Sequence, residues 1–204
     1  MAHTGVYVVL IPFQVDRTKE SHKEVQSIAE TLLLRLKRNK ERNVYPQVVF
    51  IGGTGKNSPG SIQWADDSVV YVTCHGNQRV IGPMTNDINL TPELLANDLA
   101  NVLPDTLKHL KIMTCHSGSG YLEENAYVNQ LCQFLYKKNF HSLTVYGYCG
   151  YTGEPEKKPK HSYVTVEQGK GRPYNASGAR VAVSGEEGKV QAIPPLKIFR
   201  EEVD

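Results

Sequence analysis

The chain has 204 residues, of which 40% are hydrophobic and 22% are charged, and its formal net charge is +2 at pH 7. A chain of this length and composition is expected to fold as a single domain with an ample core. The nearly balanced charge, without a strong basic run, argues against a nucleic-acid partner. The longest apolar stretch near the amino end, residues 5–13, is too short for a membrane span and lacks the flanks of a signal peptide, so no membrane partner is expected.

Cysteine spacing argues against a metal site or a disulfide framework. The four cysteines are Cys74, Cys115, Cys132 and Cys149, and no two of them form a CxxC pair. We therefore expect no metal, no cofactor and a reducing, cytoplasmic compartment. Export by a route without a cleaved signal is the alternative to this compartment, and the sequence predicts no particular oligomeric state.

The amino-terminal third predicts a strand, a helix and a second strand. Residues 6–11 form a β-branched apolar run typical of a strand that is covered on both faces. Residues 19–38 repeat apolar side chains at helical spacing. Residues 47–51 predict the second strand, and the glycine-rich segment 52–58 follows it. Phe50 stands where a Walker A motif requires its first glycine, so we interpret this segment as a turn and not as a phosphate loop.

The middle of the chain predicts two further strands with a similar sequence pattern. Residues 68–73 form an apolar run that ends in Cys74-His75-Gly76, and residues 110–113 form one that ends in Thr114-Cys115. Between them, Thr91 and Pro92 are typical of the cap and the first position of a helix.

The remaining segments complete an α/β pattern. A helix is expected over residues 121–140, a fifth strand over 142–146, a sixth over 179–183, and an extended segment over 189–199. We therefore predict a three-layer α/β/α sandwich around a mostly parallel six-stranded sheet. Within one domain, the predicted parts are a core (1–150), a mobile loop with a small hairpin (151–178), and a final strand with a tail (179–204).

The candidate site lies where the third and fourth predicted strands end. If these strands are adjacent and parallel, His75 and Cys115 come to the same sheet edge, where α/β proteins place their ligands and chemistry. A thiol needs an imidazole nearby to take its proton. The backbone N–H groups of Gly76 and Cys115 are candidates for an oxyanion hole. Cys74 and His116 neighbour these residues, but successive side chains of extended backbone point to opposite faces, so we interpret Cys74 as packed and His116 as structural or solvent-facing.

At these residues the chain resembles the caspase-like (clan CD) cysteine peptidases, which include caspases, metacaspases, gingipains, clostripain and the self-cleaving protease domains of large bacterial toxins. Cys115-His116-Ser117-Gly118 is similar to the Cys-His-Ser-Gly of metacaspases, and residues 67–71 are similar to the lead-in of their His-Gly strand. The resemblance covers about residues 5–150. It implies a caspase-like fold, His75 as the base or acid, Cys115 as the nucleophile and Gly76 as an oxyanion donor.

The resemblance leaves substrate preference open. Metacaspases place an acidic residue shortly before the end of the cysteine strand, and residues 111–114 are Lys, Ile, Met and Thr instead. Arg17 lies in the region where caspases carry an arginine that binds an acidic substrate side chain, and Tyr148 and Cys149 lie in the loop that usually forms the pocket wall. These three are the candidate substrate-binding residues, with solvation of Arg17 and packing of Cys149 as the alternatives. The lysine-rich segment 154–170 is interpreted as an ordinary flexible loop, with an internal cleavage or activation site as the alternative.

Three hypotheses follow from the sequence. The first is a cysteine endopeptidase, acting on protein or peptide substrates through a thioester and able to process itself. The second is a catalytically inactive caspase-like domain that serves as a binding or scaffold module. The third, a doubly wound ligand-binding protein, is disfavoured by the failed phosphate motifs.

Overall fold

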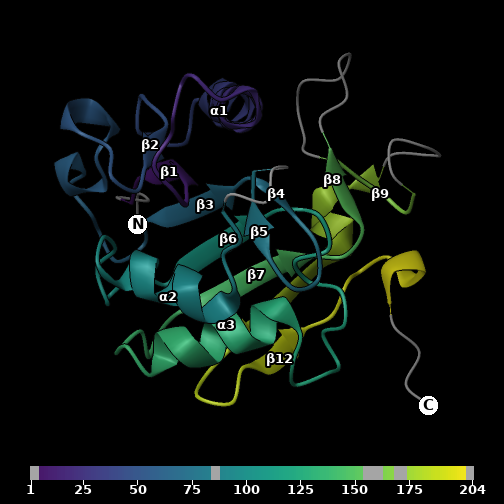
Figure 1. Cartoon of the computed structure of the whole chain (residues 1–204). Coiled ribbons are helices and arrows are strands. Elements are labelled where there is room, and N and C mark those ends of the chain that lie inside the picture. Colours follow the sequence, from purple (N-terminus) through teal and green to yellow (C-terminus); the bar gives the residue numbers. More distant parts are fainter. Residues whose placement is uncertain (1–4, 84–87, 154–162, 168–173, 201–204) are drawn as a thin grey trace.

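The computed structural model describes residues 5–83, 88–153, 163–167 and 174–200. Within these residues the chain is an α/β protein with three α-helices and a seven-stranded, mostly parallel mixed sheet. The strand order is β12-β11-β7-β6-β3-β1-β2, and it places β3 and β6 in the centre (Figure 1).

Five parallel strands make the larger part of the sheet. They are β1 (Tyr7–Ile11), β2 (Val49–Phe50), β3 (Val69–Thr73), β6 (His109–Met113) and β7 (Thr144–Tyr148). All five residues of β3 are buried, as expected for a central strand that is covered on both faces. The predicted second strand, 47–51, is confirmed only in its middle, since β2 spans two residues.

An antiparallel pair completes the sheet and corrects the predicted strand number from six to seven. β11 (Arg180–Ser184) pairs antiparallel with β7, and β12 (Lys189–Ala192) pairs antiparallel with β11. The seventh strand, β12, lies within the segment expected only to be extended. Its side chains are mostly exposed, so it carries little of the apolar pattern from which a strand is predicted.

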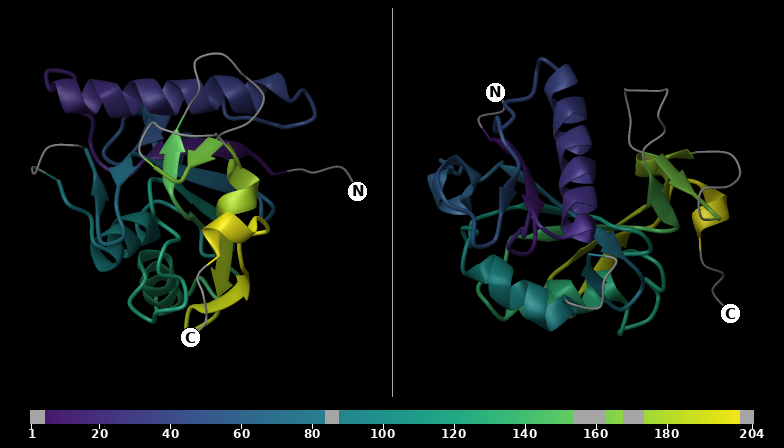
Figure 2. Two further views of the ribbon diagram at one scale, coloured as in Figure 1. Left: turned by 90° about the vertical axis from the view of Figure 1, so that its right-hand side faces the viewer. Right: turned by 45° about the horizontal axis from the view of Figure 1, so that its top comes forward.

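Helices cover both faces of the sheet. α1 (Glu20–Arg38) lies along one face, whereas α2 (Pro92–Ala100) and α3 (Tyr127–Tyr136) lie on the other (Figures 1 and 2). Thr91 caps α2 as predicted, because its hydroxyl accepts a hydrogen bond from the N–H of Leu94 at 3.3 Å. The predicted start of α3 at residue 121 is wrong, because residues 121–126 form turns that lead into the helix.

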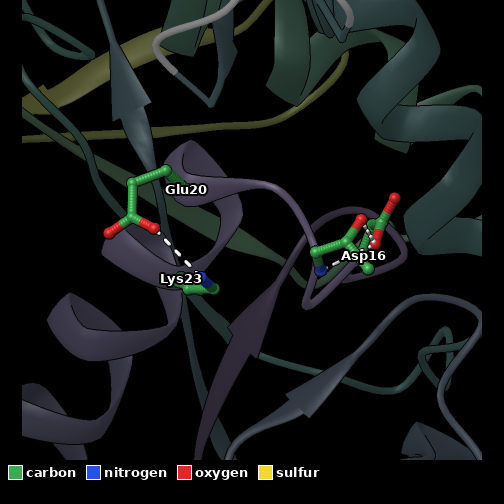
Figure 3. A network of polar contacts seen from close by, with 4 residues as sticks. Asp16, Glu20 and Lys23 are labelled. Atoms are coloured by element: carbon green, nitrogen blue, oxygen red, sulfur yellow. Dashed lines mark hydrogen bonds and ion pairs between the residues drawn. The ribbon is translucent and has the colours of Figure 1, made fainter.

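The amino end of α1 is held by short-range polar contacts (Figure 3). The carboxylate of Asp16 accepts hydrogen bonds from the hydroxyl and the N–H of Thr18, at 2.7 and 2.9 Å. These bonds lower the pKa of Asp16. Lys23 contacts Glu20 at 3.0 Å within the first turn of the helix. These contacts stabilise the connection between β1 and α1.

Two small sheets extend the carboxyl edge of the main sheet. β4 (His75–Gly76) pairs with β5 (Ile81–Gly82), directly after β3. β8 (Tyr151–Gly153), β9 (Tyr163–Thr165) and β10 (Tyr174–Asn175) form a three-stranded antiparallel sheet, which we call the side sheet. The segment predicted as a mobile loop with a hairpin, 151–178, therefore contains three strands, and its residues 154–162 and 168–173 lie outside the described part of the chain.

Short 3-10 helices fill the remaining connections: η1 (Gly55–Asn57), η2 (Pro59–Ser61), η3 (Ala176–Ala179) and η4 (Lys197–Phe199). The glycine-rich segment after β2 is thus a pair of tight turns, in agreement with its interpretation from sequence. No helix in the described ranges is long and apolar enough to cross a membrane.

Candidate active site

The register of the two central strands brings the two predicted catalytic residues to equivalent positions. β3 and β6 run parallel, and their last paired residues are Thr73 and Met113. His75 and Cys115 each follow two residues later. Because hydrogen-bonded strands lie about 4.8 Å apart, this register carries the two segments past the sheet edge side by side.

Contacts beyond the last paired residues confirm that the two segments stay together. A Cβ on Gly76 would lie 3.0 Å from the Cβ and the Oγ1 of Thr114, so the backbone after His75 packs against the residue before Cys115. Cys74, between β3 and β4, is buried, and burial raises the pKa of its thiol. The absence of a side chain at Gly76 is therefore what permits this close approach.

Cys115 is partly exposed, and its sulfur faces the side sheet. Sγ lies 3.6 Å from the backbone oxygen and 3.6 Å from the hydroxyl of Thr152, in β8. These two atoms are its hydrogen-bond partners within the described residues, and no hydrogen bond joins Cys115 to His75 there. Cys115 is thus partly exposed, and its sulfur contacts the side sheet in this conformation.

His75 faces an acidic residue that the sequence analysis missed. Its Nε2 lies 3.6 Å from Oε1 of Glu24, in the second turn of α1. This nitrogen is buried and makes no hydrogen bond to any described residue. Glu24 is one of several charged residues on the solvated face of α1, so nothing in the helical pattern separates it from its neighbours.

The turn after Cys115 adopts an uncommon backbone conformation. His116 has φ of 55°, in the left-handed region that non-glycine residues rarely occupy. Its N–H donates to the carbonyl of Gly150 at 2.8 Å, and its ring packs edge-on against Tyr151 at a centroid distance of 4.4 Å. Partial burial lowers the pKa of His116. Strained backbone that the surrounding structure enforces is typical of functional sites.

Ser117 and Gly118 connect this turn to β7, the first through a hydrogen bond and the second through a close backbone contact. The hydroxyl of Ser117 is buried, donates to the carbonyl of Ile112 at 2.8 Å and accepts from the N–H of Tyr148 at 3.0 Å. Gly118 crosses Gly147 so closely that a Cβ on Gly118 would lie 2.7 Å from the carbonyl carbon of Gly147. The order Cys-His-Ser-Gly therefore has a structural reason: each residue after the cysteine fixes the turn that presents it.

The three candidate substrate-binding residues lie in different surroundings. Arg17 is exposed and lines a cavity of about 360 Å³ between α1 and β2, which contains neither His75 nor Cys115. Tyr148 and Cys149 are buried, and Cys149 Sγ lies 3.4 Å from the carbonyl of Gly118. Their proposed contact with substrate stays a prediction.

The other cysteines pack in the interior. Cys74 and Cys132 are buried, and burial raises the pKa of Cys132 to about 12. Thiols in such surroundings are protonated and inert at neutral pH. The four cysteines form no disulfide, and the residues that the structure describes contain no cluster of three His, Cys, Asp or Glu side chains able to hold a metal ion.

Cys115, partly exposed, and His75 thus follow two neighbouring parallel strands at the same edge of the sheet, and their side chains contact Thr152 and Glu24 respectively. No protein-family model matches the chain, and no curated protein matches it.

Proposed function

We propose that the chain is a cysteine endopeptidase in which Cys115 is the nucleophile and His75 is the general base and acid. The observation that supports this most directly is the β3–β6 register, which carries both residues to equivalent positions past one sheet edge. The similarity of residues 115–118 to the metacaspase Cys-His-Ser-Gly motif adds to it, and the finer assignment of the fold as a three-layer caspase-like sandwich belongs to the same proposal.

The proposed reaction proceeds in two steps. His75 takes the thiol proton, the sulfur of Cys115 attacks the peptide carbonyl carbon, and the C–N bond breaks as His75 returns the proton to the leaving amine. Water then attacks the thioester, His75 accepts the water proton, and the thiol is regenerated with release of the acid. The N–H groups of Gly76 and Cys115 are the proposed donors to the oxyanion.

The position of Glu24 indicates which ring nitrogen of His75 acts as the base. The carboxylate stands opposite Nε2, so we assign the proton of the neutral imidazole to Nε2. Nδ1 is then the nitrogen that accepts the thiol proton. A carboxylate in this place also stabilises the imidazolium formed during the reaction. Glu24 is thus a positioning residue in this mechanism and not a catalytic one.

The contact between Cys115 and Thr152 defines what must change before catalysis. A thiol that donates to a carbonyl oxygen does not donate to an imidazole, so the side sheet and Cys115 must separate for the reaction to begin. In apo enzymes catalytic hydrogen bonds are often long and tighten only when substrate binds. Substrate entry beside β8 would provide this separation.

The test is labelling of the intact protein with a panel of peptidyl acyloxymethyl ketones, with the modified residue located by mass spectrometry. We expect modification at Cys115, complete loss in Cys115→Ala, and a fall in rate of at least about 100-fold in His75→Ala, because general-base catalysis contributes about 10²–10⁴-fold. His141→Ala is the matched control, since His141 is an exposed histidine that packs on Tyr136. The same panel reports the preferred substrate side chain.

A non-catalytic binding domain is the second candidate, and the Cys115–Thr152 contact is the observation that favours it. It predicts that Cys115 reacts with small alkylating reagents at the same rate whether or not His75 is present. Equal rates in wild type and His75→Ala, together with no cleavage of a peptide library, would reject the peptidase.

A further inference from the structure

Thr114, the residue before Cys115, carries a hydroxyl group that the proposed reaction does not use. Its side chain is enclosed, with 0% exposure, and its Oγ1 atom is buried and makes no hydrogen bond to any described residue. A buried hydroxyl without a partner destabilises the folded state, because its hydrogen bonds to water are lost on folding and are not replaced. A valine would fill the same space without this penalty. A role in function is one established reason for such a group to be kept.

The hydroxyl lies beside both backbone groups that are the proposed donors to the oxyanion. A Cβ on Gly76 would lie 3.0 Å from Thr114 Oγ1, which is the polar atom among the three atoms nearest to that position. Covalent geometry keeps the same oxygen within about 5 Å of the backbone nitrogen of Cys115, the next residue in the chain. Thr114 is therefore placed to affect the oxyanion site, although its side chain is too enclosed to contact a substrate.

The pairing of β4 with β5 directs the N–H and the carbonyl of Gly76 away from β5. The N–H of Asn77 donates to the carbonyl of Val80 at 3.0 Å, so these two residues form a hydrogen-bonded pair that continues the antiparallel ladder. Hydrogen-bonded and non-hydrogen-bonded pairs alternate, so Gly76 and Ile81 form a non-hydrogen-bonded pair. Ile81 agrees with this, since its N–H and its carbonyl both bond to Leu90 instead, at 3.1 and 2.8 Å.

These two groups of Gly76 need a restraint from another element. Glycine lacks the side chain that limits rotation about its backbone bonds, so the peptide planes beside Gly76 are less restricted than those beside other residues. A donor to an oxyanion is effective only when it is already oriented before the negative charge develops. Thr114 packs on Gly76 from outside the hairpin, and its hydroxyl is able to donate to a carbonyl oxygen.

We propose that Thr114 is a positioning residue of the oxyanion site. When substrate binds, its hydroxyl donates a hydrogen bond to the carbonyl oxygen of Gly76, and this bond holds the N–H of the same residue towards the oxyanion. The inference rests on the peptidase function proposed above for Cys115 and His75. Because the bond forms only in the complex, its free energy stabilises the transition state and not the resting protein. Thr114 acts through Gly76 and does not contact the substrate itself.

The experiment compares two reagents that react with Cys115. A peptide aldehyde that carries the side chain preferred by the ketone panel adds reversibly. The bond from the sulfur to the aldehyde carbon forms, the carbonyl π bond breaks, and the thiol proton passes through His75 to the oxygen, which occupies the oxyanion site. Iodoacetamide alkylates the same sulfur at a saturated carbon, with loss of iodide and of the thiol proton, so no oxyanion forms.

We expect Thr114→Val to raise the dissociation constant of the aldehyde about three- to tenfold, a factor that one neutral hydrogen bond accounts for. The rate of alkylation by iodoacetamide should stay as in wild type, because that reaction does not need the N–H of Gly76. Thr114→Ser keeps the hydroxyl and should restore most of the affinity for the aldehyde. A residue that only maintained the fold would change both readouts together.

Urea denaturation separates the proposed role from a role in stability. Thr114→Val should unfold at the same or at a higher urea concentration than wild type, because the change removes an unpaired hydroxyl. Undiminished stability with weaker binding is the trade-off expected of a functional residue. Thr73→Val is the matched control at the end of β3, where the buried hydroxyl lies 3.5 Å from the carbonyl oxygen of Met113. This variant should be no more stable than wild type and should bind the aldehyde as wild type does.

The outcomes that contradict the inference are distinct from a failure of the peptidase. Equal aldehyde affinity in wild type and Thr114→Val would overturn the inference and leave the peptidase in place. Unfolding of Thr114→Val at a lower urea concentration would also overturn it, since the hydroxyl would then be paired in the resting protein, and so would a Thr114→Ser that binds as weakly as Thr114→Val. A wild type that neither binds the aldehyde nor is labelled by the ketones would reject the peptidase and the inference together.

Discussion

At the scale of single residues, the candidate site consists of side chains whose roles follow from their immediate contacts. The sulfur of Cys115 is accessible and faces Thr152, whereas the imidazole of His75 is backed by Glu24. Sequence reasoning found the thiol and the imidazole because each ends an apolar run at a sheet edge. It could not find Glu24, because the contact joins α1 to β4 and depends on how the helix lies on the sheet.

The first prediction concerns Glu24. Glu24→Gln should lower the maximal rate of Cys115 labelling about two- to fivefold, since pairs that involve an exposed carboxylate contribute about 0.4–1 kcal/mol. The probe concentration at half-maximal rate should stay unchanged, because Glu24 is not expected to contact the probe. Glu24→Asp should restore part of the rate.

Added salt should reduce the difference in the maximal rate of Cys115 labelling between wild type and Glu24→Gln, because salt screens exposed ion pairs. Glu30→Gln, an exposed change further along the same helix, is the control and should leave the rate as it is. A rate for Glu24→Gln equal to that of wild type at low salt would remove Glu24 from the mechanism.

At the scale of elements, the site depends on how closely the turn after β6 approaches β7. The two segments meet at Gly118 and Gly147, and the hydroxyl of Ser117 bridges them. The sequence indicated a glycine-containing turn here, and the strands and helices around it were predicted in the right order. The sequence predicted only a small hairpin where the three-stranded side sheet lies, because its strands are two or three residues long and too short to show a period.

The second prediction tests this approach. Gly118→Ala should lower the free energy of unfolding by about 1–3 kcal/mol, because the new methyl group meets backbone atoms of β7 that cannot move alone. Urea denaturation of the pure protein measures the change. Gly60→Ala is the matched control: its Cβ would meet only the Ser58 hydroxyl at 3.5 Å, so we expect a change within about 0.5 kcal/mol. Equal stability of the two variants would contradict the packing described for the turn.

At the scale of the whole molecule, the sequence predicted an α/β domain with a mostly parallel sheet, and the structure confirms that much. Lys111 illustrates what sequence alone could not supply. In the sequence it is one polar residue inside an apolar strand, whereas in the fold it projects into a cavity that elements distant in the chain enclose. The lining includes residues 42 and 180, which the order of the strands brings together and the local pattern does not.

The third prediction concerns the pH dependence of stability. The folded pKa of Lys111, about 8, lies below its ordinary value of 10.5, so the unfolded chain binds more protons between these values. The contribution of Lys111 to stability therefore rises with pH across this window. Lys111→Met should remove this rise and stabilise the protein at pH 7 by an amount on the order of 2 kcal/mol.

Urea denaturation from pH 7 to 9.5 measures the effect. Burial raises the pKa of Tyr71 and of Tyr148, so these two neighbours of Lys111 keep their protons in this range. Lys108→Met, an exposed change next to the same strand, is the control and should show the same pH dependence of the free energy of unfolding as wild type. If the free energy of unfolding of Lys111→Met changed with pH as steeply as that of wild type, Lys111 would not be the source of the pH dependence.

The unequal burial of the four thiols has a practical consequence. Three of them are enclosed and one is partly open, and none is tied up in a bridge. A stoichiometric titration with a coloured disulfide reagent would thus count one sulfur per folded chain and four per unfolded chain. The number of reactive thiols per chain therefore reports whether the protein is folded. Any variant that retains all four cysteines can be assayed in this way without an added reporter group.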